Sequence, residues 1–497
     1  MRDKREIVDE KDLQRIVNRL RKNGCDDALY EVKKCATNLS SDIWESISAF
    51  ANTEGGTLLL GLDEDSGFVP VPHFEVDKVC SQLISGMGDG GDDGKLTNPP
   101  HYSILRIPLE ESPVLVTRIE ELEPFYKPCY ISDRGKAGGS YKRVDDADIK
   151  LTPNEVYSLE NACNASQFDR APVEEASVVD LDEAIYVQAF AKAAQLNPRA
   201  LRGAEDIKTK LSRLNFTDSE GSVTKAGLLV AGAYPQQFFP KLCIDVAVHP
   251  GTQKASQDGV RFLDRVFCEG TLGEMIDDAL GAIVKNLRRI SVVEGRGRRD
   301  ELEIPEEVLR EAIANAVIHR DYSEHFDGEA ISVDIYDDRV EVRNPGCLWG
   351  GKSRKNLADG RSCCRNATLM KLMTIVPLPS GAGSPAEGNG TGILLMMRMM
   401  KEHGLEQPIF CPQFDHFKVI LNRPQVSASE KPSLRKAPVD ILKLLTQEGE
   451  LSTRELADRS GLSIVQVRAR LRKLIDEGAV EPTAAETSRN RKYRVRS

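Results

Sequence analysis

The sequence lacks the features that mark membrane proteins, disulfide-stabilised proteins and P-loop enzymes. No apolar run approaches the roughly 20 residues that a membrane-spanning helix needs. The first residues, MRDKREIVDE, contain no apolar core of a signal peptide. The 11 cysteines are scattered without a Cys-x-x-Cys pair, which indicates free thiols in a reducing compartment. The chain has no P-loop pattern either. We therefore expect a cytoplasmic protein without membrane segments.

The composition is that of an ordinary globular protein with several domains. The chain has 497 residues, of which 40% are hydrophobic and 29% are charged. That length is enough for about three or four domains, each with its own core. The net charge is −10, so any contact with nucleic acid must come from local basic patches. No internal repeat is present.

The stretch LREAIANAVIHRDY, residues 309–322, is the most informative in the chain. Apolar residues recur at i, i+4, i+7 and i+8 from Leu309, which predicts a helix buried against a sheet. Glu311, Asn315 and His319 follow one another at single-turn spacing on another face. Such a line suits a nucleotide site, because an Asn oxygen can ligate Mg²⁺ and a carboxylate can polarise water. The same spacing also occurs by chance on solvated helix faces.

The sequence after this helix favours a ligand site. Residues 329–344 alternate around Asp337-Asp338, which predicts two strands joined by a tight turn. The second strand ends in Asn344-Pro345-Gly346, where the glycine lets backbone approach a flat ligand. Later, GNGTG at 388–392 runs into the apolar helix ILLMMRMMKEHG. A glycine loop that opens a helix offers N–H groups to phosphates. The methionines of that helix we assign to core packing.

The order of these parts resembles the GHKL ATPases, which have a Glu-x-x-x-Asn helix, a hairpin with a glycine turn, a glycine-rich lid and a second helix. More narrowly, four segments look like a divergent bacterial branch that is often labelled helicase-like or transcriptional-regulator-like: REAIANAVIHRDY, DDRVEVRNPG, CRN at 364–366, and GNGTGI. The resemblance implies an α/β sandwich that binds ATP with Mg²⁺ and acts as an ATP hydrolase. It does not imply unwinding.

The resemblance also assigns roles to single residues. Glu311 would be the general base, Asn315 the Mg²⁺ ligand, and Asn344 would stand where most of the superfamily has an adenine-binding Asp. An amide can accept from the adenine amino group, but more weakly than a carboxylate, so the choice of base stays open. The full nucleotide-binding set is Asn315, His319, Arg320, Asp321, Asn344, Gly346, Gly388, Gly390, Thr391 and Gly392. An alternative for residues 319–321 is a helix C-terminus stabilised by cations.

The first 150 residues resemble a second family, the Schlafen AlbA-like domains. The matching elements are Glu31-Val32-Lys33, AFANTEGG at 49–56, residues 61–63, and the closing strand at 141–144. Some Schlafen relatives cut RNA with an acidic cluster, and the matching candidates here are Asp26, Glu31 and Asp63. Asp26 stands where the nuclease members usually carry Glu. The alternatives are a nucleic-acid-binding domain and a purely structural one.

The local patterns of this segment predict its elements. The spacing of apolar residues predicts a helix over 9–23 that stops at Gly24, and Ser40 or Ser41 is expected to cap the next helix. Basic residues could contact phosphates or form an ordinary solvated surface. They are Lys33, Lys34, Lys127, Arg134, Lys136, Lys142 and Arg143.

The C-terminus has the pattern of a winged helix. Two helices are separated by a turn at Gly461, the second helix of the motif is SIVQVRARLRKLIDEG, and RKYRVR is the strand-like end of a wing. Residues 434–497 contain 14 Lys and Arg against 9 Asp and Glu, a local net charge of +5. Candidates for DNA contact are Ser463, Gln466, Arg468 and Arg470 on the recognition helix, with Arg489, Arg491 and Lys492 on the wing. The alternative is a winged helix that binds protein.

These segments predict an α+β multidomain protein. Its expected parts are a Schlafen AlbA-like α/β domain at 1–164, a linker at 165–179, a connecting segment at 180–300, a GHKL-like sandwich at 301–421, a linker at 422–436 and a winged helix at 437–497. The leading hypothesis is an ATP-controlled regulator that binds DNA or RNA, in which a lid at 377–392 closes and the chain could form a homodimer. The rivals are an ATP-gated nuclease, which could serve in defence, and a degenerate ATPase scaffold.

Overall fold

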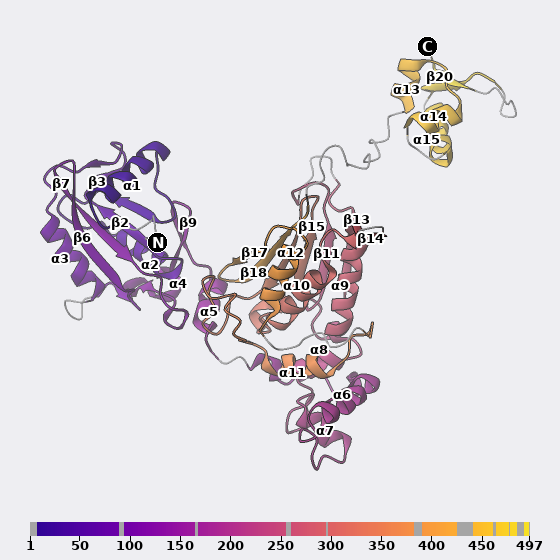
Figure 1. Cartoon of the computed structure of the whole chain (residues 1–497), viewed down its shortest axis with the longest axis horizontal. Helices are drawn as coiled ribbons and strands as arrows, with labels where there is room; N and C mark the ends of the chain where they lie inside the picture. Colours follow the sequence, from indigo (N-terminus) through magenta and orange to yellow (C-terminus); the bar gives the residue numbers. More distant parts are fainter. Residues whose placement is uncertain are drawn as a thin grey trace. The chain divides into compact units, whose positions relative to one another are not determined.

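The chain forms two compact units, residues 1–424 and 425–497 (Figure 1). The computed structural model describes residues 7–88, 94–164, 167–254, 260–294, 297–381, 390–424, 441–460, 464–476, 478–484 and 492–496. Within these ranges no helix is long and apolar enough to cross a membrane. The expected α+β class is confirmed, because both units contain helices and strands, and most of the described strand pairs are antiparallel.

The N-terminal part is built on a four-stranded sheet in the order β1-β2-β7-β6. Its first pair is parallel and the others are antiparallel. The apolar side chains of α1 pack in one core with residues of these strands, and those of α2 and α3 pack in another. The bounds are α1 Glu10–Asn23, β1 Tyr30–Lys33, α2 Ile43–Asn52, β2 Gly56–Leu60, α3 Val76–Met87, β6 Tyr102–Leu109 and β7 Ser112–Ile119.

Two predictions about the helix ends of this part have different outcomes. Helix α1 begins after Asp9, whose carboxylate accepts from the Asp12 N–H at 2.9 Å, and it ends at Gly24 in the left-handed region, as predicted. The expected cap of α2 by Ser40 or Ser41 is wrong, because Asp42 holds the N-cap position. The Asp42 side chain makes no cap hydrogen bond and instead pairs with Lys33 at 2.7 Å.

Short elements complete the N-terminal part. They are β3 Leu62–Asp63, β4 Val69–Pro70, β5 Leu96–Thr97, β8 Tyr130–Ile131, α4 Gly135–Gly139, β9 Tyr141–Val144, β10 Ala147–Lys150 and α5 Pro153–Asn161. Helix α5 starts with a capping box between Thr152 and Glu155. Such reciprocal bonds satisfy two N–H groups and fix where the helix begins.

The central part is a six-stranded sheet in the order β12-β11-β15-β16-β18-β17. Its strands are β11 Ile244–Val248, β12 Asp264–Cys268, β15 Ile331–Ile335, β16 Arg339–Pro345, β17 Ile409–Pro412 and β18 His416–Asn422. Helices α9 Leu272–Asn286, α10 Glu306–Ile318 and α12 Gly392–Glu402 lie against it (Figure 1). Strands β15 and β16 form the predicted hairpin around Asp337-Asp338, with Ile335 opposite Val340.

Further helices and a hairpin extend this core. They are α6 Glu183–Leu196, α7 Ile207–Arg213, α8 Lys225–Ala231, β13 Arg289–Glu294, β14 Gly297–Leu302 and α11 Ala367–Ile375. Residues 167–180, inside and beside the expected linker, form two 3₁₀ turns. There the buried Asp169 accepts hydrogen bonds from the N–H groups of Thr368 and Leu369 at 2.8 and 3.1 Å. This carboxylate therefore stabilises the N-terminus of α11.

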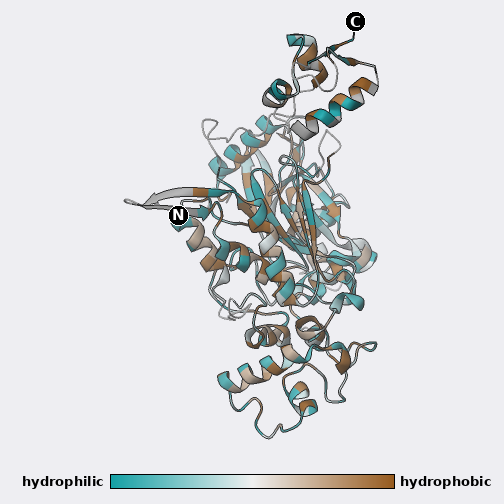
Figure 2. Cartoon of the chain, turned by 90° about the vertical axis from the view of Figure 1, so that its right-hand side faces the viewer, coloured by the Kyte–Doolittle hydropathy of each residue, from teal (hydrophilic) through white to brown (hydrophobic). Residues whose placement is uncertain are grey.

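The second unit has three helices and a two-stranded antiparallel wing. Its elements are α13 Ile441–Glu448, α14 Thr453–Ser460, α15 Ile464–Asp476, β19 Val480–Pro482 and β20 Tyr493–Val495. A capping box starts α14: Ser452 N–H donates to Glu455 at 2.7 Å, and Glu455 N–H donates back to Ser452 at 3.3 Å. In Figure 2 the helices carry hydrophobic and hydrophilic residues side by side, the amphipathic pattern that predicted them.

Candidate functional site

A cavity of about 220 Å³ lies between α10, β16, α12 and the loop after β16. Seven of the predicted nucleotide-site residues line it, from three segments far apart in the sequence: Glu311, Asn315, His319, Asn344, Gly390, Thr391 and Gly392. The structure thus brings the carboxylate, the amides and the glycine loop together in one place. Gly388, another member of the predicted set, lies outside the described residues.

Helix α10 positions the polar line. Pro305 stands at its N-cap, and Leu309, Ile313 and Val317 are buried in the core, so the opposite side chains face the cavity. The Asn315 side-chain N–H donates to Glu311 Oε1 at 3.0 Å. Because the nitrogen of Asn315 is used in this bond, its Oδ1 is left as an acceptor that can bind a cation.

The glycine loop closes over this helix. A Cβ on Gly392 would overlap the Glu311 carboxylate and lie 3.0 Å from Asn315 Nδ2. A Cβ on Gly390 would lie 2.7 Å from the backbone nitrogen of Ser362. Thr391 holds the N-cap of α12, whose first N–H groups therefore begin beside the cavity. The loop must consist of glycine at 390 and 392 for this packing.

The opposite end of the cavity is flat and apolar. Asn344, which is 5% exposed, lies on β16 opposite Phe417 of β18. The Phe410 and Phe417 rings lie 6.3 Å apart at an angle of 22°. Gly346 follows in the left-handed region at φ 104°, and a Cβ there would lie 2.7 Å from the Cβ of Asp321. Two aromatic rings and a buried amide suit a planar ligand with a polar edge.

His319 is neutral in this setting. Burial lowers the pKa of its imidazole to about 4, and nearby Arg365 adds to the effect. Its side chain has no hydrogen-bond partner among the described residues. A neutral ring can both donate and accept hydrogen bonds toward a ligand.

Arg320 and Asp321, two further residues of the predicted set, do not line the cavity. Arg320 is 1% exposed and donates to the Phe326 carbonyl at 2.7 Å. Asp321 accepts from the Ser323 N–H at 2.9 Å and forms an ion pair with Arg365 at 2.9 Å. These contacts hold the segment that follows α10 in place. Arg320 and Asp321 therefore stabilise the site without lining the cavity.

Sequence reasoning missed the outer wall of the cavity, the loop from Cys347 to Cys363. Lys352 pairs there with Asp359 at 2.5 Å, and the same carboxylate accepts from the Arg361 N–H at 2.8 Å. Arg361 and Arg310 also line the cavity, and neither guanidinium has an acidic partner among the described residues. The loop has no hydrophobic period that could have revealed it. The sign of these charges favours an anionic ligand.

The same loop contacts helix α5. The Gly350 N–H donates to the Ala162 carbonyl at 2.7 Å, and the Trp349 indole N–H donates to the Asn164 carbonyl at 3.0 Å. The Cys347 thiol lies 3.4 Å from the Ser158 carbonyl, to which it donates. Trp349 and Cys347 line the cavity as well, so one loop touches both the cavity and the helix that follows the N-terminal sheet.

Two carboxylates of the predicted acidic cluster in the N-terminal part form ion pairs with Lys and Arg side chains. Glu31 pairs with Lys33 at 2.7 Å and with Arg143 at 2.6 Å. Asp63 pairs with Lys34 at 2.6 Å. Throughout the described residues no group of three or more His, Cys, Asp or Glu has an arrangement that could hold a metal ion. These charges form a balanced network and not an open metal site.

Asp26 differs from the other two carboxylates. One of its oxygens accepts from the Val32 N–H at 2.9 Å, while the other is buried without a partner in the described part of the chain. Burial raises the pKa of Asp26 to about 7, and nearby Glu31 adds to the rise. The candidate contacts Lys142 and Arg143 are also engaged, with Glu155 and Asp148 respectively.

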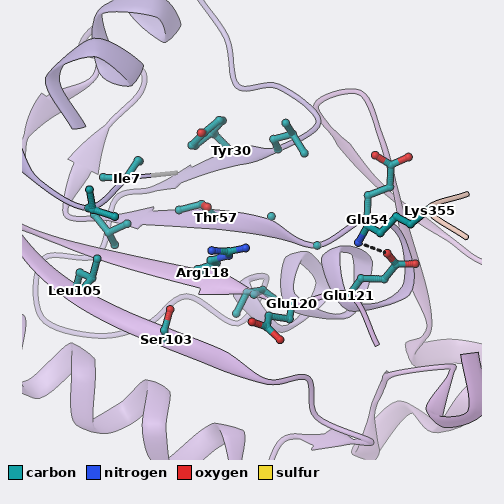
Figure 3. A pocket seen from close by; sticks show the side chains of 16 residues that line it. Ile7, Tyr30, Glu54, Thr57, Ser103, Leu105, Arg118, Glu120, Glu121 and Lys355 are labelled. Atoms are coloured by element: carbon teal, nitrogen blue, oxygen red, sulfur yellow. Dashed lines mark hydrogen bonds and ion pairs between the residues drawn. The ribbon is translucent and has the colours of Figure 1, made fainter. Parts of the chain in front are cut away.

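A second cavity, of about 420 Å³, lies on one face of the N-terminal sheet (Figure 3). Thr57, Arg118 and Ser103 come from neighbouring strands of its floor. Its charged lining also includes Lys355, which pairs with Glu121 at 3.3 Å, and the carboxylates of Glu54 and Glu120. Because its described lining has three carboxylates and two cations, the charge does not favour a phosphate ligand.

On the winged-helix unit, Arg468 and Arg470 are exposed on α15 and Lys492 is half-buried beside β20. Ser463, Arg489 and Arg491 lie outside the described residues, as does the side chain of Gln466.

Three family models match separate parts of the chain. Residues 26–152 match "Schlafen, AlbA_2", residues 328–421 match "Putative ATP-dependent DNA helicase recG C-terminal", and residues 434–481 match "Winged helix-turn-helix DNA-binding". The chain has a Schlafen AlbA_2, ATPase-like and winged-helix architecture. This architecture confirms the resemblances seen in the sequence. The ATPase-like match begins after α10, so it does not include Glu311 and Asn315.

Solved structures that are similar to the chain include the following two. The DIP2311 protein from Corynebacterium diphtheriae has 20% identity and a TM-score of 0.39, over 89% of this chain and 87% of that one. The N-terminal domain of an ATP-dependent DNA helicase RecG-related protein from Nitrosomonas europaea has 27% identity and a TM-score of 0.22, over 29% of this chain and 95% of that one. No curated protein matches the chain.

Proposed function

We propose that the protein is an ATP-binding, nucleic-acid-binding regulator in which ATP with Mg²⁺ controls the nucleic-acid-binding segments. The observation that carries the proposal is the convergence of Glu311, Asn315, Asn344 and Gly392 on one cavity. The guanidinium groups of Arg310 and Arg361, which have no acidic partner in the described part of the chain, supply positive charge for phosphates. The winged-helix unit, with its local excess of Lys and Arg, supplies the contact with DNA.

The donor set of the cavity fits Mg²⁺. Asn315 offers an amide oxygen beside the Glu311 carboxylate, and Mg²⁺ in nucleotide sites is held by few protein oxygens together with phosphates and water. Asn315 would hold the ion, which supplies charge neutralisation for the phosphates. Glu311 would accept a proton from the attacking water, so that the site acts as an ATP hydrolase. The N–H groups at the start of α12 would bind the phosphates.

The contacts between the cavity wall and the α5 region support the proposal that the nucleotide regulates nucleic-acid binding. Cys347 lines the cavity and touches the Ser158 carbonyl of α5, and Trp349 lines it and donates to the Asn164 carbonyl just after that helix. Lys142 of β9 pairs with Glu155 of α5. A change in the wall on nucleotide binding would therefore reach the N-terminal sheet. We also propose a homodimer as the nucleotide-bound state. Cleavage of nucleic acid is not part of the proposal, because Glu31 is ion-paired with Lys33 and Arg143.

Calorimetric titration of ATP with Mg²⁺ into the wild type and into Asn315→Ala tests the site. We expect binding by the wild type and a marked loss in the variant. The affinity of the intact protein for duplex DNA is then measured with and without saturating ATP and Mg²⁺, and light scattering under both conditions gives the oligomeric state. A DNA affinity that is the same in both conditions would refute the control by ATP.

A further inference from the structure

Asn344 is a buried amide whose oxygen and nitrogen both lack a hydrogen-bond partner among the described residues. Its Oδ1 is buried and accepts no hydrogen bond among the described residues, and its side-chain nitrogen donates none to them. A buried amide without partners is unfavourable, so native proteins rarely leave one unless a ligand or water completes it. Asn344 lines the cavity, which makes a bound ligand the natural partner.

The position of Asn344 places it at the base end of the site. The Asp321 N–H, just beyond the C-terminus of α10, donates to the carbonyl of Pro345, the neighbour of Asn344, at 3.0 Å. Glu311 and Gly392 lie toward the other end of α10, two turns or about 12 Å from His319. The phosphates belong near Glu311, so the amide of Asn344 faces the part of a nucleotide farthest from them.

The apolar wall around the amide fits a flat ring. Val342 and Val419 line the cavity beside Phe410 and Phe417. A base that packs there has only its edge available for a polar contact, and Asn344 is the amide that can meet this edge.

On the basis of the proposed nucleotide site, we propose that Asn344 forms hydrogen bonds with the edge of the base and that the site accepts both adenine and guanine nucleotides. An amide offers one acceptor and one donor side by side. Adenine presents an N6 donor beside the N1 acceptor, and guanine presents the O6 acceptor beside an N1 donor. A half turn of the amide exchanges its oxygen and nitrogen, so either edge forms two hydrogen bonds. No group of the described residues holds the amide in one of the two orientations.

A carboxylate at this position would behave differently, because it only accepts. It would keep one bond with either base, from adenine N6–H or guanine N1–H, and its second oxygen would face the acceptor beside it, adenine N1 or guanine O6, which is repulsive. Cytosine and uracil present similar edges but lack the second ring, so they bury less surface against the apolar wall. The expected order of affinity is therefore ATP similar to GTP, with CTP and UTP weaker.

The test is a set of calorimetric titrations with ATP, GTP, inosine triphosphate, CTP and UTP, each with Mg²⁺. In the wild type we expect ATP and GTP to bind within about tenfold of each other, and inosine triphosphate, which has the O6 and N1–H of guanine, to bind like GTP. Asn344→Asp should weaken ATP and GTP alike, by roughly tenfold each, because either base loses one of its two hydrogen bonds. Asn18→Asp, on the exposed face of α1, is the control for the added charge.

The outcomes distinguish a failure of the dual base choice from a failure of the nucleotide site itself. A wild type that binds ATP but prefers it over GTP by more than about a hundredfold overturns the dual base choice and leaves the nucleotide site standing. The same holds if Asn344→Asp folds and binds ATP and GTP as tightly as the wild type does. A wild type that binds no nucleotide overturns the proposed function and this inference together. The wild-type ratio decides the question even if the variant fails to fold.

Discussion

Gly392 packs against the carboxylate of Glu311 so closely that a methyl group in place of its hydrogen would overlap an oxygen of that carboxylate. The glycine opens α12 and the glutamate lies on α10, so the contact joins the two helices that border the cavity. Gly390 makes a similar contact with the backbone of Ser362. The glycine loop is therefore fitted to both the helix and the outer wall.

Gly392→Ala is expected to weaken ATP binding by roughly tenfold or more, because the added methyl group pushes α12 away from Glu311. Calorimetry measures the change in affinity, and a thermal melt shows whether the fold persists. Gly281→Ala is the matched control, since a Cβ at that position of α9 meets nothing within 4 Å. Equal ATP affinities of the two variants would contradict the packing argument.

Glu311→Gln is expected to keep ATP binding and to reduce hydrolysis by about 10²- to 10⁴-fold, the usual contribution of a general base. The amide keeps the shape of the side chain and an acceptor for Asn315 but is too weak a base to take a proton from water. A steady-state phosphate-release assay beside calorimetry separates the two effects. Unchanged hydrolysis would exclude Glu311 as the base.

Arg361→Ala is expected to weaken ATP binding about tenfold while changing ADP binding less, since Arg361 lies beside Gly390 at the phosphate end. Arg310→Ala, next to Glu311, should act in the same direction. Titrations of ATP and ADP into each variant give the ratio. Lys371→Ala on the exposed face of α11 is the control. Equal losses for ATP and ADP would argue against a role at the terminal phosphate.

Asp26→Asn is expected to change the dependence of stability on pH. The folded pKa of Asp26, about 7, lies above its ordinary value of 3.8, so the stability from the protonated carboxyl is present below about pH 4 and is lost as the pH rises to 7. The variant should therefore gain melting temperature relative to the wild type between pH 5 and pH 8. Asp63→Asn should show no such gain, because Lys34 lowers the pKa of Asp63.

Arg470→Ala, on the exposed face of α15, is expected to weaken duplex binding at all sequences and to reduce the slope of log affinity against log salt by about 1. Fluorescence anisotropy at several salt concentrations gives the slope. Lys192→Ala, exposed on α6, controls for the loss of one positive charge. A slope that stays the same would assign this face to a protein contact.

Periodic elements of this protein can be predicted from sequence, and the loop around its site cannot. The spacing of apolar residues from Leu309 predicted α10 and the line of polar residues on it. The alternation around Asp337-Asp338 predicted the β15–β16 hairpin. The cavity wall at Arg361 has no period, so its place depends on contacts with Asp359 and Gly390. The pairing of Glu31 with Arg143 joins residues far apart in the chain, which local patterns do not reveal.

Gly350 and Trp349 of the cavity wall bind carbonyl groups just after α5, so that the cavity and the N-terminal part depend on each other. Equilibrium coupling between two ligands is reciprocal. If bound nucleotide changes the affinity of the N-terminal part for nucleic acid by some factor, bound nucleic acid changes the affinity for nucleotide by the same factor. The amount of nucleic acid in the cell would then influence how much ATP the protein binds. The occupancy of the cavity would depend on bound nucleic acid, just as nucleic-acid binding depends on the nucleotide.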